Sequence, residues 1–234
     1  QKSEEGLEAR LIHQVGGTVT VKSSDDGLNA KDWTLESSEG QGPGQQTKTV
    51  KAEAANVKNL DQAGEVKIVI DGGTLTVDAE GDGLDANGSI EINGGTVVVN
   101  GPTSGANAAL DYDDNGKLNG GTVLFVDNGE MTMGFGSDSS QAFLMASVQG
   151  TAGTTVEVVD SSGKTVASLK ASKAFSTVLI SSPEIKEGEK YTIKVGSNST
   201  TATASKQAAN IGGGPGQGGP GGGQPGQGGR PGGR

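Results

Sequence analysis

The sequence of 234 residues contains no cysteine, a single histidine and only 3% aromatic residues. Without cysteine there are no disulfides, no thiolate metal sites and no cysteine nucleophile. A Ser-His-Asp triad would have to use His13, which falls one residue out of the apolar register of its strand and is expected at the surface. Four Phe, two Tyr and one Trp cannot fill a large conventional core, so the core must be thin and aliphatic.

Long apolar runs and positive charge are also scarce. No run approaches the roughly 18 residues that a membrane span requires, and no signal peptide is recognisable. The formal net charge is −10, with only three Arg, so the chain should repel the phosphates of nucleic acids. Because the chain starts at Gln1 rather than Met, we expect a processed or trimmed N-terminus.

Glycine, by contrast, is abundant, with 42 residues, and it falls in two alternating motifs. The pair of motifs returns every 21 or 22 residues, with about 34 extra residues inserted after Ala30. Gly-Leu-x-Ala begins at Gly6, Gly27 and Gly83, with a variant at Ala109, and Gly-Gly-Thr begins at Gly16, Gly72, Gly94 and Gly120.

Apolar residues alternate around each Gly-Gly, as in Ile68 and Ile70 followed by Leu75 and Val77. This period of two indicates strands with one buried face, and helical patterns are nearly absent. A chain that returns every 22 residues and buries one face of each strand is typical of a parallel β-helix. The fold class is therefore all-β. We expect one inner column to contain Val19, Leu75, Val97 and Val123.

Three regions are expected. Residues 1–141 form the β-helix, with an inserted loop at about 31–64 that carries Trp33, either as a hydrophobic plug or as a sugar-stacking residue. Residues 142–206 form an antiparallel β unit that caps the helix or stands as a small sandwich. Residues 207–234 are rich in Gly, Pro and Gln and are expected to be disordered. The strands expected in the antiparallel unit are 155–159, 165–169, 175–181 and 191–195.

The acidic corners between strands carry the candidate chemistry. Stacking would align Glu5, Asp26 and Asp82 in one row, whereas Glu8, Asn29, Asp85 and Asp111 would form a second. At a strand spacing of about 4.8 Å, like charges repel by about 3.5 kcal/mol per pair at an effective dielectric constant near 20. The nearest lysines are Lys31 and Lys117. Carboxylate and amide oxygens without His or Cys select Ca²⁺, so we expect a calcium site at Asp25, Asp26, Asn29, Asp82, Asp85, Asp111 and Asp113.

One corner also fits part of a calcium loop. Residues 111–116 match the first six positions of the pattern D-x-D-x-N-G. The twelfth position is Thr122, so the bidentate Glu of an EF-hand is missing and a complete EF-hand is excluded. A partial site completed by a neighbouring repeat remains as an expectation.

The motifs together resemble a family of secreted bacterial carbohydrate-binding proteins built as right-handed parallel β-helices similar in shape to pectate lyases. The resemblance covers nearly all of the chain except its tail. The residues that carry it are Ser24-Asp-Asp-Gly-Leu-Asn-Ala30, Ile70-Asp-Gly-Gly-Thr74, Gly81-Asp-Gly-Leu-Asp-Ala86, Ile92-Asn-Gly-Gly-Thr96, Asn100-Gly-Pro102 and Ala109-Leu-Asp-Tyr112, followed more loosely by 160–163 and 175–183.

The resemblance implies calcium-dependent, non-catalytic binding of an acidic plant polysaccharide such as polygalacturonate, with cellulose as another ligand of the same class. It also implies an extracellular or cell-surface location, and we expect a monomer with no nucleic-acid partner. By this resemblance, Asp26, Asp82, Asp85 and Asp111 look like the calcium-bearing positions. The residues assigned to saccharide contact are Trp33, Lys31, Tyr112 and Lys117.

Three other functions stay open on the sequence alone. A polysaccharide hydrolase could use the abundant Asp pairs, and a lyase would need a cationic base such as Arg10, Lys31 or Lys117 beside calcium. A structural stalk or adhesin would use the same repeats without saccharide affinity. An ice- or crystal-binding surface requires a flat outward Thr array, which Val98 and Leu124 interrupt.

Overall fold

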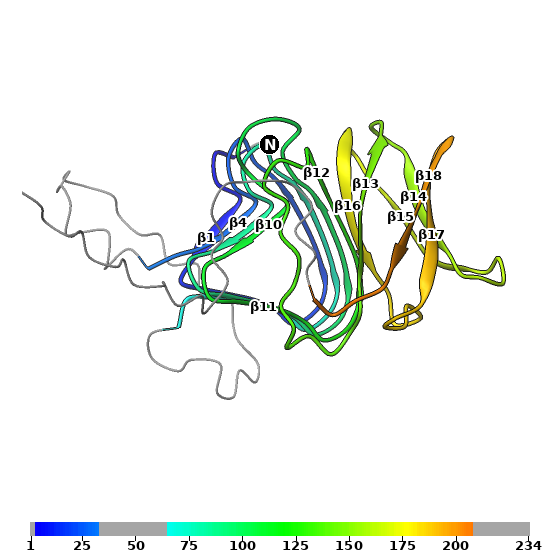
Figure 1. Ribbon diagram of the computed structural model, residues 1–234. Helices are drawn as coiled ribbons and strands as arrows, with labels where there is room; N and C mark the ends of the chain where they lie inside the picture. Colours follow the sequence, from blue (N-terminus) through cyan, green and yellow to red (C-terminus); the bar gives the residue numbers. More distant parts are fainter. Residues whose placement is uncertain (1–2, 33–64, 208–234) are drawn as a thin grey trace, which may run out of the picture.

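The computed structural model describes residues 3–32 and 65–207. In these ranges all the regular secondary structure is β-strand (Figure 1). Within them, no helix is long and apolar enough to cross a membrane. Four layers of three strands come first: β1 (Leu7–Ala9), β2 (Leu11–Gln14), β3 (Thr18–Lys22); β4 (Leu28–Ala30), β5 (Lys67–Ile70), β6 (Thr74–Asp78); β7 (Leu84–Ala86), β8 (Ser89–Ile92), β9 (Thr96–Asn100); β10 (Leu110–Tyr112), β11 (Asn115–Leu118), β12 (Thr122–Asp127). The C-terminal strands are β13 (Leu144–Gly150), β14 (Thr155–Val159), β15 (Thr165–Lys170), β16 (Phe175–Ser181), β17 (Lys190–Val195) and β18 (Asn198–Thr203).

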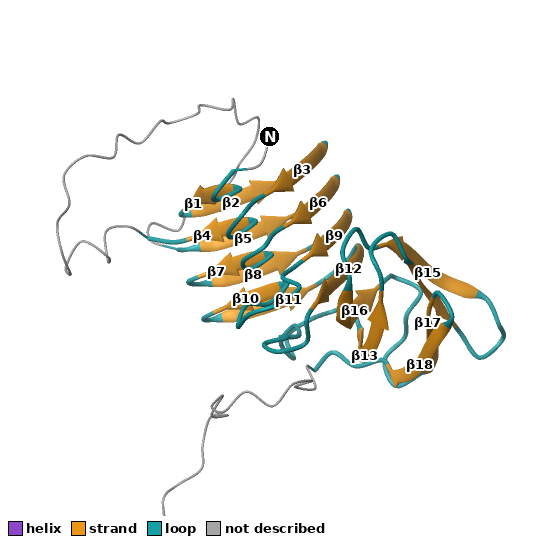
Figure 2. Ribbon diagram, turned by 90° about the horizontal axis from the view of Figure 1, so that it is seen from above, coloured by secondary structure: helices purple, strands orange, loops and turns teal. Residues whose placement is uncertain are grey.

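Each layer gives one strand to each of three parallel sheets (Figure 2). The first sheet contains β1, β4, β7 and β10, the second contains β2, β5, β8 and β11, and the third contains β3, β6, β9 and β12. The pairing register places equivalent residues of successive repeats opposite one another. The expected column of Val19, Leu75, Val97 and Val123 is present. The prediction of an all-β chain with stacked repeats is therefore confirmed.

A narrow aliphatic core fills the space between the three sheets. It is made by the inward side chains of each strand, because alternate residues of a strand point to opposite faces. In layer 1 the position of Ile70 and Ile92 is taken by Gln14, whose side-chain amide donates to the carbonyl oxygen of Thr74 at 3.3 Å. The fully buried members include Leu28, Ile68, Ile70, Leu75, Leu84, Ile90, Ile92, Leu110 and Leu118.

The two motifs require glycine for different physical reasons. The second glycine of each Gly-Gly has positive φ, from 76° at Gly17 to 92° at Gly121, a conformation that side chains disfavour. The glycine of Gly-Leu-x-Ala instead allows close packing between layers. A Cβ built on Gly83 would lie 2.4 Å from the carbonyl oxygen of Ala109 and 2.2 Å from a methyl carbon of Val99.

Aromatic residues close the core beyond layer 4. The Phe135 ring meets Phe125 and Phe143 edge to face, with centroids 5.8 Å apart in both pairs. Phe135 is fully buried. The segment around it is bound to layer 4, since the Gly136 amide donates to the carbonyl oxygen of Gly116 at 2.7 Å.

Residues 142–206 were expected to form an antiparallel unit that caps the β-helix or stands as a small sandwich. In the structure β16 pairs antiparallel with β12 and extends the third sheet, with β13 on its far side. The remaining strands form an antiparallel sheet in the order β15-β14-β17-β18, hereafter the C-terminal sheet. A second core lies between the two sheets and includes Leu124, Val126, Ile180, Val158 and Ile193.

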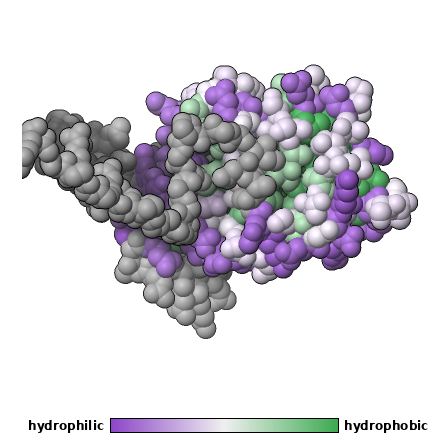
Figure 3. Space-filling view, in the orientation of Figure 1, coloured by the Kyte–Doolittle hydropathy of each residue, from purple (hydrophilic) through white to green (hydrophobic). Residues whose placement is uncertain are grey.

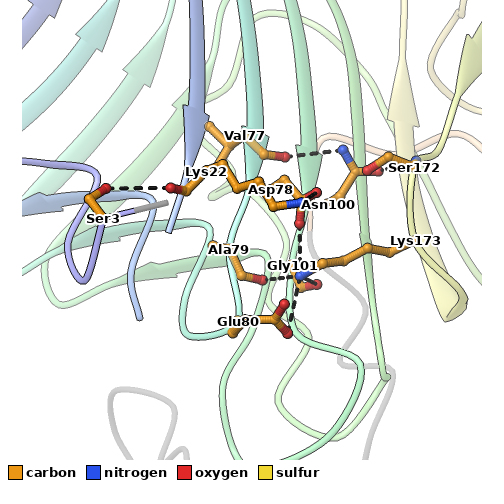
Figure 4. A network of polar contacts seen from close by, with 10 residues as sticks. All are labelled: Ser3, Lys22, Val77, Asp78, Ala79, Glu80, Asn100, Gly101, Ser172 and Lys173. Carbon is orange, nitrogen blue, oxygen red and sulfur yellow. Dashed lines mark hydrogen bonds and ion pairs between the residues drawn. The ribbon is translucent and has the colours of Figure 1, made fainter. Parts of the chain in front are cut away.

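Lys173, which belongs to none of the sequence motifs, binds the segment before β16 to layers 2 and 3 (Figure 4). Its ammonium group lies 3.1 Å from the Asp78 carboxylate and 3.5 Å from that of Glu80. It also donates to the carbonyl oxygens of Ala79 and Gly101. The side chain is only 13% exposed, so these oxygens replace most of its hydration.

Replacing Lys173 by methionine is expected to lower the melting temperature by roughly 5–10 °C, because it removes a largely buried cation from Asp78 and the donor to the carbonyl oxygens of Ala79 and Gly101. Lys170→Met is the matched control, since Lys170 is exposed at the end of β15. Thermal unfolding followed by circular dichroism measures both. Equal melting temperatures for the two variants would show that the contacts of Lys173 contribute nothing to stability.

Candidate metal and saccharide site

The acidic corners lie along one side of the stack, in the short strands of the first sheet and in the turns next to them. Its register places Glu8 opposite Asn29, Asn29 opposite Asp85 and Asp85 opposite Asp111, which confirms the stacking expected for this row. Figure 3 shows hydrophilic residues at the left edge of the layered part, where β1 and β4 lie in Figure 1, as well as along the other edges of this face. We call Glu8, Asn29, Asp85 and Asp111 the outer row.

A second line of carboxylates, which we call the corner row, contains Glu5, Asp26 and Asp82. Here each aspartate bonds to the backbone of the next layer. The Asp82 amide donates to Asp26 Oδ1 at 2.7 Å, and the Ala108 amide donates to Asp82 Oδ1 at 2.6 Å. One oxygen of each aspartate therefore holds two layers together, and the row ends at Ala108, which has no carboxylate.

Five carboxylates of the two rows are harder to ionise than free side chains: those of Glu5, Asp26, Asp82, Asp85 and Asp111. Burial, followed by the negative charges of Asp26, Asp82 and Asp111, raises the pKa of Asp85 to about 7. Burial is also the main cause that raises the pKa of Asp82 to about 6 and that of Glu5 to about 7.

The pKa values of Asp26 and Asp111 are also raised, again chiefly by burial. A nearby positive ion would lower all of these pKa values, because it stabilises the ionised form.

Asn29 belongs to the outer row and, within the part of the chain that the structure describes, has one unsatisfied polar atom. Its side chain is only 5% exposed, and its Nδ2 donates to Asp26 Oδ2 at 3.2 Å. Its Oδ1 is buried without a hydrogen-bond partner among the described residues. A buried acceptor without a partner costs about 1–3 kcal/mol, so a group that satisfies it is favoured.

The two lysines expected near the rows behave differently. Lys31 forms an ion pair with Glu8 at the layer 1 end of the outer row. Lys117 lies on the second sheet and pairs with Asp138 at 3.9 Å, so the structure does not place it as a counter-charge to either row. It instead lines a cleft of about 510 Å³ together with Lys67 and Glu91.

The remaining residues predicted to bind metal or saccharide are not all placed next to the two rows. Asp25 and Asp113 are exposed beside the rows. The Tyr112 hydroxyl donates to the carbonyl oxygen of Gly134 at 2.8 Å, so this group already has an internal partner. Trp33 lies outside the described residues.

The partial calcium loop at 111–116 does not form a single loop. These residues contain the end of β10, a corner at Asp113 and Asp114, and the start of β11. The Asn115 amide donates to Asp138 Oδ2 at 3.4 Å. The side chains that the pattern would direct toward one ion are therefore divided between two sheets.

His13 is less exposed than expected, with 12% of its side chain accessible. Its Nε2 lies 2.7 Å from Asp71 Oδ2, and Asp71 Oδ1 accepts from Asn93 at 2.8 Å. Asn93 Oδ1 in turn accepts from Asn119 at 2.8 Å. Within residues 3–32 and 65–207, His13 Nε2 bonds to Asp71 and its Nδ1 has no hydrogen-bond partner, so no serine or threonine hydroxyl is hydrogen-bonded to this ring.

The rows therefore hold oxygen donors of the kind that calcium prefers. As placed, the described ranges contain no group of three or more His, Cys, Asp or Glu side chains that closes around a metal ion. Binding of an ion would require changes of side-chain rotamer. Comparison of the chain with protein-family models, curated proteins and solved structures gives no match.

Proposed function

We propose that the chain is a right-handed parallel β-helix that binds calcium along its acidic rows and, through calcium, an acidic polysaccharide such as polygalacturonate. The protein acts without catalysis, as a monomer, outside the cell or at its surface. The ion would be held by Asp26, Asn29, Asp82, Asp85 and Asp111, with Asp25 and Asp113 at the rim.

The observation that carries the proposal is the buried Oδ1 of Asn29, which lacks a partner among the described residues and lies in line with Asp85 and Asp111. A neutral amide oxygen between carboxylates is a normal calcium ligand, whereas a lysine would satisfy only part of such a row. Burial and, after it, neighbouring carboxylates raise the pKa values of Asp85 and Asp82, and a cation held by the rows would offset both effects.

Calcium also removes a difficulty with the ligand. A protein with a net charge of −10 should repel a polyuronate chain. A divalent ion that protein carboxylates only partly coordinate keeps open positions that carboxylates of the polymer can occupy. Several uronates on one polymer then add avidity, so long chains should bind more tightly than short oligomers.

Substituting Asp85 and Asp111 by asparagine is expected to weaken calcium-dependent binding of polygalacturonate by at least about tenfold, because each change removes a charged ligand. Affinity electrophoresis in polygalacturonate gels, with calcium and with chelator, measures the retardation. The methyl-esterified polymer should give little retardation, since it lacks carboxylates.

Asp114→Asn is the matched control, because Asp114 is an exposed acid at the same corner but outside both rows. It should bind as the parent does. The proposal would be contradicted if the parent is still retarded in chelator. It would also be contradicted if the Asp85→Asn and Asp111→Asn variants are retarded as strongly as the parent. Circular dichroism checks that the variants remain folded.

A further inference from the structure

Layer 1 (residues 3–22) is the open end of the stack. Its strands β1, β2 and β3 are terminal members of their three sheets, so among the described residues each has a strand on one side only (Figure 2). At the opposite end, Phe135 covers the core beyond layer 4, and β16 extends the third sheet past β12. The core is therefore covered at one end and open at the other.

The aliphatic core reaches the surface at layer 1. Three large apolar side chains are exposed in the described part of the chain, and two of them, Leu7 at 42% and Val15 at 64%, belong to this layer. A cavity of about 320 Å³ is lined by both residues together with Leu28 and Ile70 of layer 2. Leu28, the equivalent of Leu7 in layer 2, is only 2% exposed because layer 1 covers it.

The backbone at this end is suited to a polypeptide partner. The Gly17 carbonyl accepts from the Thr74 amide, and the Ser23 amide donates to the Asp78 carbonyl, so the odd-numbered residues of β3 bond to β6. Because successive residues of a strand direct their backbone groups to opposite sides, the amide and carbonyl of Thr20 face away from layer 2. Such a row of donors and acceptors is matched by the edge of another strand.

Gly16 has no steric role within one chain. In the later repeats, a Cβ built on Gly72, Gly94 or Gly120 would lie 3.0, 2.7 or 2.4 Å from a backbone carbonyl oxygen of the preceding layer. A Cβ on Gly16 would meet no atom within 4 Å, and its φ is not positive. A further layer of strands docked on layer 1 would give Gly16 the same reason to be glycine as its equivalents have.

We propose that layer 1 is a dimerisation surface, on which a second copy of this chain docks head to head about a two-fold axis. The second copy presents the same strand edges and the same apolar side chains, so backbone groups and core positions find partners together. Layer 1 contains three Glu against one Arg and one Lys, a formal charge of −1 in a protein of −10, so two copies repel little at this end. Because this interface is isologous, the assembly stops at two chains.

The size of the surface predicts a weak dimer. Layer 1 contains twenty residues, the lower limit of the roughly 20–30 residues that each side of a standard interface contributes. We therefore expect a dissociation constant of roughly 1–100 µM. The monomer remains the form in dilute solution, and each chain keeps its own acidic rows, so this contact does not alter the proposed calcium site.

Sedimentation equilibrium in chelator, at chain concentrations from about 1 to 500 µM, measures the association without calcium bridges between chains. The parent should change from monomer to dimer across this range. Val15→Lys places a charge on the apolar end, and Gly16→Ala adds a Cβ where the partner's backbone approaches. Each should raise the dissociation constant at least about tenfold. The Cβ of Gly16→Ala meets no atom of its own chain, so the monomer of this variant should stay folded.

Met131→Lys is the matched control, since Met131 is an exposed apolar residue outside layer 1. It should dimerise as the parent does. The proposal is overturned if the parent stays monomeric at the highest concentration, if it forms assemblies larger than a dimer, or if Val15→Lys and Gly16→Ala dimerise as the parent does. A monomeric parent that binds a synthetic peptide of residues 67–78, which form the strands of layer 2, would assign layer 1 to a strand of another protein instead.

Discussion

Replacing Gly83 by alanine is expected to destabilise the protein by roughly 3–5 kcal/mol, a large effect for the addition of one methyl group. The new Cβ would overlap the carbonyl oxygen of Ala109 at 2.4 Å and a methyl carbon of Val99 at 2.2 Å. The first contact is with backbone, which cannot move without separating layers 3 and 4. Gly83 does not have positive φ, so the effect is steric rather than conformational.

Urea unfolding followed by circular dichroism gives the free energy of unfolding. Gly16→Ala is the matched control, because a Cβ on Gly16 would meet no atom within 4 Å and its φ is not positive. Its free energy of unfolding should stay within about 0.5 kcal/mol of the parent. A Gly83→Ala variant as stable as Gly16→Ala would show that the layers are not packed as described.

The second large effect is expected from calcium. An ion present at about 100 times its dissociation constant should stabilise the native state by about 2.7 kcal/mol, because it binds the unfolded chain much more weakly. For a chain of this size, this corresponds to a rise in melting temperature of roughly 5–10 °C. Magnesium should give a smaller rise, since it requires tighter octahedral geometry. Scanning calorimetry at pH 8, with calcium and with chelator, measures the shift.

The free energy of unfolding without metal should also depend on pH, in a direction that can be checked. Without metal, Asp85 and Glu5 have folded pKa values of about 7, well above their ordinary values near 4. The native state therefore binds more protons than the unfolded chain between about pH 4 and 7, and stability falls as the pH rises through this range.

Calcium competes with these protons, so its stabilising effect should be large at pH 8 and small at pH 5. Equal melting temperatures with calcium and with chelator at pH 8 would contradict the bridging of the rows by calcium.

The strands of the layered part and their alignment could be predicted from the sequence, because each strand pairs with the equivalent strand of the neighbouring repeat. Once the period is known, the inward column of Val19 and Leu75 and the alignment of Asp85 with Asp111 follow from counting residues. The function of each carboxylate does not follow in the same way. Whether Asp26 points to solvent or accepts from the Asp82 amide depends on the path of the backbone at the corner, which the repeat does not specify.

The pairing of β16 with β12 was not predicted, although the sequence contains a signal for it. Val178, Leu179 and Ile180 are consecutive apolar residues, whereas a strand with one exposed face alternates. A continuous apolar run indicates burial on both faces. Leu179 packs in the first core, and Val178 and Ile180 pack in the second. Contacts such as those of Lys173 with layers 2 and 3 had no comparable signal, because they depend on how two regions of the chain dock.

The long insertion between β4 and β5 has a consequence for the order of folding. Ile68 pairs with Ile90 one repeat later, but Ile12 must find Ile68 across the inserted residues. Closing this longer loop costs only about 0.8 kcal/mol more than closing one repeat, yet the strands of layer 1 are among the least buried of the stack. Nucleation is therefore favoured among β5 to β12, where neighbours are local. Layer 1 would join last, as the end of a growing stack and not as its template.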